Sequence, residues 1–252
     1  MSESSLEPHR RMRRPFLALI ASYALGTFND NHFKQAVMLI AVAMGRAEVQ
    51  GYAAAAFTLP FVFLAAPAGW AADRFSRRTM VLGAKAIEIF AAGLGWIGLV
   101  TGHLGLMVGM VGLMGIQATF FSPALNGSIP ELFPPHRVTQ ANAVLRLFIT
   151  MAILTGTALA GIVLDIPGTT RFGAPLGRVL LGLAVIALAV LGFLVSLGIP
   201  RRPPADPTRP FPWSGPRETW SELRRSFRDA WLGTIILTDA YIWDLGTLQL
   251  LL

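Results

Sequence analysis

The chain has 252 residues, of which 54% are hydrophobic and only 14% are charged. Soluble domains carry about 25% charged residues, so this composition indicates a membrane protein. The absence of cysteine excludes disulfide scaffolds, thiol enzymes and cysteine-ligated zinc sites. The net charge of +7 would suit a nucleic acid only if the basic residues formed one solvated face, but they lie in short clusters between apolar runs.

Seven apolar runs are long enough to cross a membrane, because a helix needs about 20 mostly apolar residues to span the hydrocarbon core. We therefore predict an all-α integral membrane fold with a six-span bundle over residues 15–198. The predicted spans are residues 15–44, 51–72, 79–101, 104–124, 138–164, 177–198 and, as a seventh, 232–252.

Two polar segments flank this bundle. Residues 1–14 form a basic N-terminus. Their arginine pair resembles a twin-arginine export signal, but the apolar run that follows continues through a polar patch and leads into further spans, unlike a cleaved signal. Residues 199–231 are rich in Pro and Arg, which predicts a solvated linker. Apolar residues recur there at helical spacing, at Trp220, Leu223, Phe227 and Trp231. This spacing suits either a helix on the membrane surface or a solvated linker helix.

The basic residues are distributed unequally between the two sides of the predicted bundle. With a cytoplasmic N-terminus, 16 of the 21 Lys and Arg residues fall in inner segments, including Lys85, and three fall in outer loops. Cytoplasmic loops carry an excess of Lys and Arg. We therefore predict that the N-terminus lies inside and that the anionic inner leaflet, not a nucleic acid, is the partner of these residues.

Charged and amide residues inside the spans form the candidate site, because ionisable groups in a membrane usually face a cavity or a partner. These residues are Asn29, Asp30, Asn31, Lys34, Glu88 and Arg146. Asp30 and Lys34 are four residues apart, so they share a helix face and can pair. The pair is either only structural or part of a cavity that meets a lipid headgroup or a coupling ion. Asn29 and Asn31 point to different sides of the helix, and we expect His32 to be a packing residue.

Glu88 and Arg146 lie at similar depths in the third and fifth spans, which predicts an ion pair between the two helices. Alternatively, Glu88 pairs with Lys85, one turn away on its own helix. Asp239 and Asp244 in the seventh span have no visible partner. The sequence has no nucleotide-binding loop, metal-ligand cluster or nucleophile–base constellation, so we predict a transporter without cofactor or metal, not an enzyme.

Residues 69–78, Gly-Trp-Ala-Ala-Asp-Arg-Phe-Ser-Arg-Arg, resemble the loop between spans two and three of the major facilitator superfamily, Gly-x-x-x-Asp-Arg-x-Gly-Arg-Arg. Ser76 replaces the second Gly of that motif. We expect the first Gly to allow tight packing, the Asp to cap a helix terminus, and the arginines to contact the anionic leaflet. By this resemblance, the residues of a conformational gate loop are Gly69, Asp73, Arg74, Arg77 and Arg78.

Three further segments are similar to the bacterial lysophospholipid transporter branch of that superfamily. They are residues 28–34 in the first span, residues 122–132 after the fourth, and residues 141–161 in the fifth. The match covers roughly residues 15–165. Two positions depart from the pattern of the branch: Arg146 stands where an acidic residue is common, and Ala143 where Gly is common.

This resemblance implies a transporter that moves lysophospholipids, chiefly lysophosphatidylethanolamine, across the bacterial inner membrane by alternating access of two six-span halves. Some relatives are fused to an acyltransferase, which makes such an enzyme a possible partner. On this basis we expect a truncated chain that lacks the C-terminal half. The alternatives are another carrier of the superfamily, such as an exporter of a drug or metabolite, and a fragment without transport activity.

Overall fold

The computed structural model describes residues 7–171, 173–213, 221 and 224. The chain divides into two compact units, Met1–Arg209 and Pro210–Leu252, and the helices discussed below belong to the first unit. The predicted seventh span, with Asp239 and Asp244, lies outside the described residues, as does most of the predicted linker helix.

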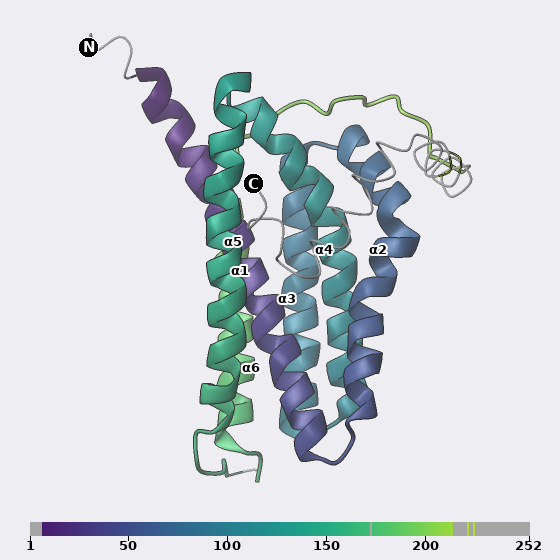
Figure 1. The fold of residues 1–252 in the computed structure, drawn as a ribbon, viewed down its shortest axis with the longest axis vertical. Helices are drawn as coiled ribbons and strands as arrows, with labels where there is room; N and C mark the ends of the chain where they lie inside the picture. Colours follow the sequence, from purple (N-terminus) through teal and green to yellow (C-terminus); the bar gives the residue numbers. More distant parts are fainter. Residues whose placement is uncertain (1–6, 172, 214–220, 222–223, 225–252) are drawn as a thin grey trace. The chain divides into compact units, whose positions relative to one another are not determined.

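The first unit is a bundle of long helices (Figure 1). Their bounds are α1 (Glu7–Ala43), α2 (Glu48–Arg74), α3 (Arg77–Thr101), α4 (Leu104–Leu132), α5 (Pro135–Leu164) and α6 (Leu176–Ser196). Each predicted span of the bundle corresponds to one helix, and five of them, α2 to α6, are long and apolar enough to cross a membrane. In α1, which has 37 residues, the polar run at 29–34 lowers the hydropathy. The predicted all-α membrane fold is confirmed.

Two helices extend further than predicted. α1 begins at Glu7 rather than at residue 15, and α4 continues to Leu132 rather than ending at residue 124. The segment 122–132, which we placed after the fourth span, therefore forms the last turns of α4. An apolar run marks where a helix lies in hydrocarbon, whereas backbone hydrogen bonding continues beyond it. Prolines such as Pro15 are tolerated inside these helices because neighbouring helices compensate for the lost hydrogen bond.

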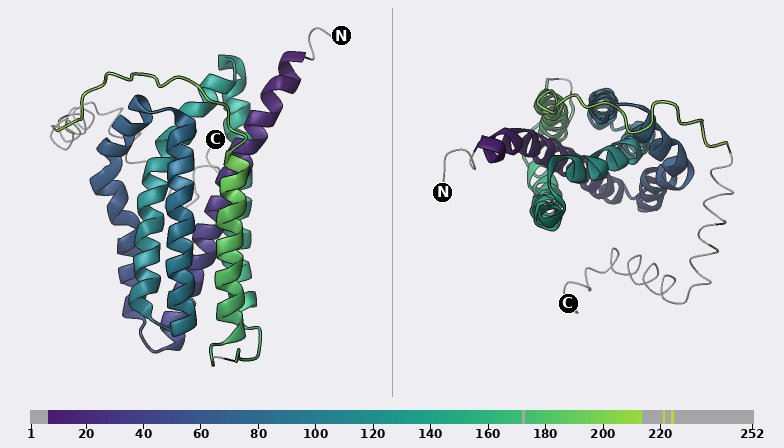
Figure 2. Two further views of the ribbon diagram at one scale, coloured as in Figure 1. Left: turned by 180° about the vertical axis from the view of Figure 1, so that it is seen from behind. Right: turned by 90° about the horizontal axis from the view of Figure 1, so that it is seen from above.

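The helices pack in an order that differs from their order in the chain. α1 runs diagonally across the bundle and packs against α5 and α6, while α3 packs against α4 and α6, and α2 packs against α4 (Figures 1 and 2). Small residues allow the closest approaches. A Cβ added at Gly156 of α5 would lie only 2.7 Å from the carbonyl oxygen of Phe28 of α1, so this contact requires glycine.

Two apolar clusters form the core of the bundle. One contains Phe33, Leu99, Met107, Met110, Met114, Leu181 and Val185. The other contains Leu19, Val81, Phe121, Leu125, Ile129, Leu145 and Ile149. On each of α1, α3 and α4, buried polar residues lie in sequence between the members of these two clusters, and on α4 a further one, Ser128, lies among the members of the second cluster. The bundle core is therefore apolar, then polar, then apolar along its length.

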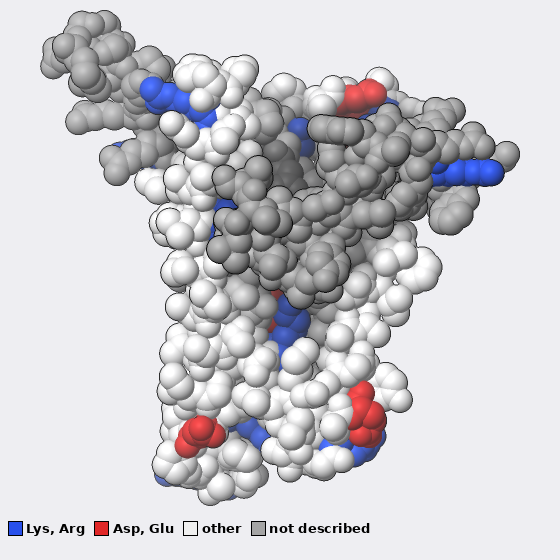
Figure 3. Space-filling view, in the orientation of Figure 1, with Lys and Arg blue, Asp and Glu red and all other residues white. Residues whose placement is uncertain are grey.

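The outer surface of the bundle agrees with a position in lipid. In Figure 3, the visible charged side chains gather near the two ends of the bundle, and the surface between them is mostly uncharged except for one small patch. Large apolar side chains are exposed on the bundle, including Val62, Phe63 and Phe90. An apolar band of this kind is the surface that hydrocarbon favours over water.

Candidate functional site

The site begins with the buried polar residues between the two apolar clusters. Apart from the hydroxyl residues Ser22 and Thr119, they are Asn29, Asp30 and His32 of α1, Lys85 and Glu88 of α3, and Gln117 of α4. We call this set the polar layer. At most 7% of any of these residues is exposed. Polar groups at this depth are costly unless they are paired, so their partners decide what the layer can do.

An ion pair on α3 is the centre of the polar layer. The ammonium group of Lys85 donates to Glu88 Oε2 at 2.6 Å, and the two side chains are 2% and 0% exposed. Asn29 of α1 donates from Nδ2 to the other carboxylate oxygen, Glu88 Oε1, at 3.1 Å. The Lys85 ammonium also lies 5.4 Å from the ring centre of Phe121, within the range of a cation–π contact. Glu88 thus holds α1 and α3 together.

Glycine makes room for the Lys85 ammonium group. A Cβ at Gly26 of α1 would lie 2.5 Å from Lys85 Nζ, and a Cβ at Gly192 of α6 would lie 3.3 Å from it. The long side chain of Lys85 therefore occupies space that two glycines leave open on neighbouring helices. We counted Lys85 among the inner loop residues, but the structure buries it.

Of the two partners considered for Glu88, the structure selects Lys85 rather than Arg146. Arg146 is exposed on α5, a helix that packs chiefly against α1, whereas Glu88 is buried on α3. The argument from equal depth considered only the position of each residue along its helix, and not the direction in which its side chain points. The predicted pair between Glu88 and Arg146 is therefore replaced by one within α3.

Asp30 faces α4 rather than its neighbour on α1. Gln117 Nε2 lies 3.5 Å from both carboxylate oxygens of Asp30, at the outer limit of a hydrogen bond. Lys34 is half-buried, and its ammonium group lies 3.8 Å from the ring centre of Phe57 of α2. Among the described residues, no ion pair joins Asp30 to Lys34. The two charges remain on adjacent turns of one helix without a direct bond.

The remaining polar residues of α1 serve packing. Asn31 is half-buried and donates from Nδ2 to the Thr27 carbonyl at 2.7 Å, so it points away from Asn29 as predicted. His32 Nδ1 lies 3.0 Å from the carbonyl oxygen of Gly156 on α5, and its ring stacks on Phe28. His32 therefore fixes α1 against α5, which agrees with its expected role.

The second candidate region is the gate loop at the end of α2. The carboxylate of Asp73 forms an ion pair with Arg209 of the linker. The backbone N–H of Asp206 donates to the Asp73 carbonyl at 3.0 Å. The Arg209 carbonyl accepts from the side chains of Trp70 and Arg74, each at 3.0 Å. The linker is thus attached to the loop through both backbone and side chains.

Two expectations for the gate loop are wrong in detail. Asp73 does not cap a helix terminus: Ser76 is the N-cap of α3, and its side chain accepts from the Thr79 N–H at 3.2 Å. Serine is a favoured N-cap residue, so the replacement of the second Gly of the motif by Ser76 has a local structural reason. No heavy atom of the described chain would lie within 4 Å of a Cβ at Gly69, so this glycine does not serve close packing there.

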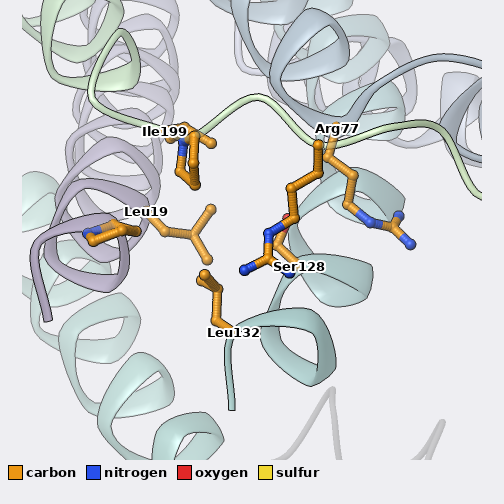
Figure 4. A pocket seen from close by; sticks show the side chains of 8 residues that line it. Leu19, Arg77, Ser128, Leu132 and Ile199 are labelled. Carbon is orange, nitrogen blue, oxygen red and sulfur yellow. The ribbon is translucent and has the colours of Figure 1, made fainter. Parts of the chain in front are cut away.

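Arg77, in the first turn of α3, lines a small pocket beside the gate loop. Its guanidinium group occupies the space that a Cβ at Gly127 of α4 would need. Figure 4 shows Arg77 and Ser128 on one side of this pocket and Leu19 and Ile199 on the other. Arg202 of the linker completes its basic lining. Arg78, the last residue of the motif, is half-buried.

Sequence reasoning missed two contributors to these sites. Gln117 is a lone amide in a strongly apolar span, and that isolation was the available signal. Arg209 was noted only as one of many linker arginines, and nothing in the local sequence marks it as the partner of a residue 136 positions away. Both contacts depend on how elements far apart in the chain meet.

Comparison with known proteins gives a family. The family model of the Major Facilitator Superfamily matches residues 16–251. The lysophospholipid transporter LplT of Klebsiella pneumoniae subsp. pneumoniae is 27% identical over 256 residues, covering 100% of this chain and 60% of that protein. The protein of the same name from Serratia proteamaculans is 25% identical over 202 residues, covering 78% of this chain and 46% of that protein. The chain thus spans about 60% of the length of the first relative.

Proposed function

Because this chain belongs to the Major Facilitator Superfamily, we propose that it is part of a transporter that moves lysophospholipid, of the lysophosphatidylethanolamine type, across the bacterial inner membrane by alternating access. The polar layer carries this proposal, since it places charged and amide groups of three helices at one level of an otherwise apolar bundle. The similarity to proteins named lysophospholipid transporters supports the choice of substrate.

The substrate headgroup would meet two charged side chains of α1, Asp30 and Lys34, that do not form an ion pair with each other. The Asp30 carboxylate, with only long contacts to Gln117, is suited to the ammonium group of ethanolamine. Lys34, whose ammonium lies over Phe57, is suited to the phosphate. Arg146, exposed on α5, would offer a second cation to the same headgroup. The acyl chain would lie against the exposed apolar faces of the helices. Ligand sites are commonly lined by apolar side chains, with a few polar groups that fix the orientation of the ligand.

The Lys85–Glu88 pair has a different part in this proposal. Its charges satisfy each other, and Asn29 occupies the second oxygen of Glu88. It would position α1, so that Asp30 keeps a fixed height in the bundle. Asn31, bonded to its own helix, would take no direct part in binding.

The gate loop would control the change between the inward-open and outward-open states of the transporter. We assign this end of the bundle to the cytoplasm, together with residues 1–14 and 199–231, because basic residues are concentrated there. Arg74, Arg77 and Arg78 would face the anionic leaflet. The Asp73–Arg209 ion pair is half-exposed, so it can open at small energetic cost. Alternating access needs a second six-span half, which a second copy of this chain would supply in the membrane. An acyltransferase is a further protein partner that this function favours.

Transport can be tested in liposomes that contain the 252-residue chain. Fluorescent lysophosphatidylethanolamine is added to one leaflet, and its movement is followed by extraction with albumin. We expect protein-dependent movement that Asp30→Asn slows at least about tenfold, a loss of about 1.4 kcal/mol in the transition state. The matched control is Glu48→Gln, because Glu48 is half-exposed at the start of α2 and pairs only locally with Arg46.

Three other results would contradict the proposal or part of it. Movement of a soluble drug but of no lysophospholipid would favour an exporter of drugs or metabolites. Movement by the Klebsiella relative, but not by this chain, would favour a fragment without transport activity. Equal transport by wild type and Asp30→Asn would show that Asp30 of the polar layer takes no part in transport.

A further inference from the structure

A second pocket lies at the end of the bundle opposite the gate loop. It is formed where α1 and α5 end and α6 begins, and its volume is about 450 Å³. Apolar side chains, including Leu39 and Leu164, line it together with one carboxylate, Asp165, and one guanidinium, Arg178. This volume is within the range of about 300–1,000 Å³ that small-molecule sites occupy.

The two charges of the pocket are not placed to stabilise their helices. Asp165 is the C-cap of α5, and Arg178 lies in the first turn of α6. A helix carries about half a negative charge at its C-terminus and half a positive charge at its N-terminus. Each side chain therefore has the same sign as the helix end on which it lies. The pocket consequently has one negative wall, at α5, and one positive wall, at α6.

Both charged side chains are also available for a ligand. Within the described part of the chain, neither forms an ion pair or a side-chain hydrogen bond. Pro175, the N-cap of α6, supplies no side-chain cap, and the Leu176 and Arg178 N–H groups donate to the carbonyl oxygens of Gly168 and Pro175 at 2.9 and 3.1 Å. The Arg178 guanidinium is half-buried near the turn between α3 and α4, where a Cβ at Gly102 would lie 3.5 Å from it.

We propose that this pocket binds the headgroup of a zwitterionic lysophospholipid, with phosphate at Arg178 and the ammonium group at Asp165. The Arg178 guanidinium and the positive end of the α6 dipole both favour phosphate, and the two walls match the two charges of the headgroup. Leu39 lines the pocket and is itself exposed, and together with Leu164 it provides an apolar contact for a single acyl chain. The choice of lipid rests on the proposed function. The pocket would capture that lipid at the outer leaflet, apart from the polar layer.

Native mass spectrometry of the detergent-solubilised 252-residue chain can measure this binding. Lysophosphatidylethanolamine is the probe, and lysophosphatidylglycerol, which lacks the amine, is the comparison lipid. We expect Arg178→Gln to weaken binding of both lipids at least about tenfold and Arg178→Lys to retain most of it. Asp165→Asn should abolish the preference for the ethanolamine lipid. Arg171→Gln, at an exposed loop position outside the pocket, is the matched control and should change neither affinity.

Competition separates the possible sources of the same headgroup. Glycerophosphoethanolamine, which has no acyl chain, should compete only weakly, and strong competition would overturn the assignment to a lipid. Equal competition by diacyl phosphatidylethanolamine would overturn the assignment to a lysophospholipid. Unchanged binding in folded Arg178→Gln and Asp165→Asn proteins, judged by thermal unfolding, would overturn the site. Binding without transport would contradict the proposed function but leave this site intact.

Discussion

Two ion pairs in this bundle use the same chemistry in opposite surroundings. Lys85 and Glu88 meet inside the polar layer with exposures of 2% and 0%, whereas Arg209 and Asp73 meet beside the gate loop with exposures of 51% and 32%. Burial of a charge makes the loss of its partner expensive, while water replaces a lost partner at the surface. The buried pair is therefore suited to fix helix positions, and the exposed pair is suited to open and close.

The largest effect should follow from breaking the buried pair. Glu88→Gln would leave the Lys85 ammonium in the bundle without its counter-charge, and we expect a loss of about 3–5 kcal/mol in unfolding free energy. The double variant Lys85→Met with Glu88→Leu removes both charges and should recover most of this loss. Reversible unfolding in mixed micelles measures both values. A loss below about 1 kcal/mol for Glu88→Gln would show that the two pairs do not differ.

A smaller effect should come from the space around Lys85. Gly26→Ala would bring a methyl group to 2.5 Å from Lys85 Nζ, and such overpacking costs about 1–3 kcal/mol. Gly83→Ala in α3 is the matched control, because a Cβ there would meet no heavy atom within 4 Å in the described chain. Alanine favours helix over glycine by about 1 kcal/mol, so the control should be stabilised. Equal effects of the two substitutions, again measured by unfolding, would contradict close packing at Lys85.

Removing the exposed pair should change dynamics more than stability. Arg209→Ala should lower the unfolding free energy by less than about 1 kcal/mol. Hydrogen exchange of the Asp206 amide, which donates to the Asp73 carbonyl, should nevertheless become several times faster. Arg201→Ala, at an exposed position in the same linker, should leave that exchange unchanged. A stability loss as large as that of Glu88→Gln would mean that the contact is structural.

The smallest expected effect is a pH dependence at the linker turn. Hydrogen bonds from the Thr208 hydroxyl and backbone N–H lower the pKa of Asp206 below its ordinary value. A carboxyl pKa that is lower in the folded than in the unfolded state stabilises the fold at pH values above the ordinary pKa of about 3.9. This stabilisation is lost as the pH falls through the lowered pKa of the folded state. The protection of the Thr208 amide, which is its exchange rate compared with the intrinsic rate at the same pH, should fall below about pH 4. Asp206→Asn should remove this pH dependence. Constant protection in the wild type would contradict this assignment.

The sequence predicts the helices of this protein better than their contacts. Hydropathy located the six helices of the bundle, and five of these, α2 to α6, satisfy the same requirement for length and apolarity. The extension of α4 to Leu132 was missed because helical hydrogen bonding outlasts the apolar run. The predicted pairing was wrong, because Glu88 pairs within α3 while Arg146 is exposed on α5. The position of a residue along its helix follows from its residue number, whereas the direction in which its side chain points depends on the packing of all the helices.

The polar layer also has a consequence for the order of biosynthesis. Asn29 and Asp30 emerge first, and their partners Glu88 and Gln117 follow 59 and 87 residues later. Gly156, whose carbonyl lies at His32, follows 124 residues later. At a synthesis rate of about 5–20 residues per second, that last interval lasts roughly 6–25 seconds. For this time the ribosome-bound chain holds a helix whose polar centre must be shielded by the insertion machinery or by water, until the later helices arrive.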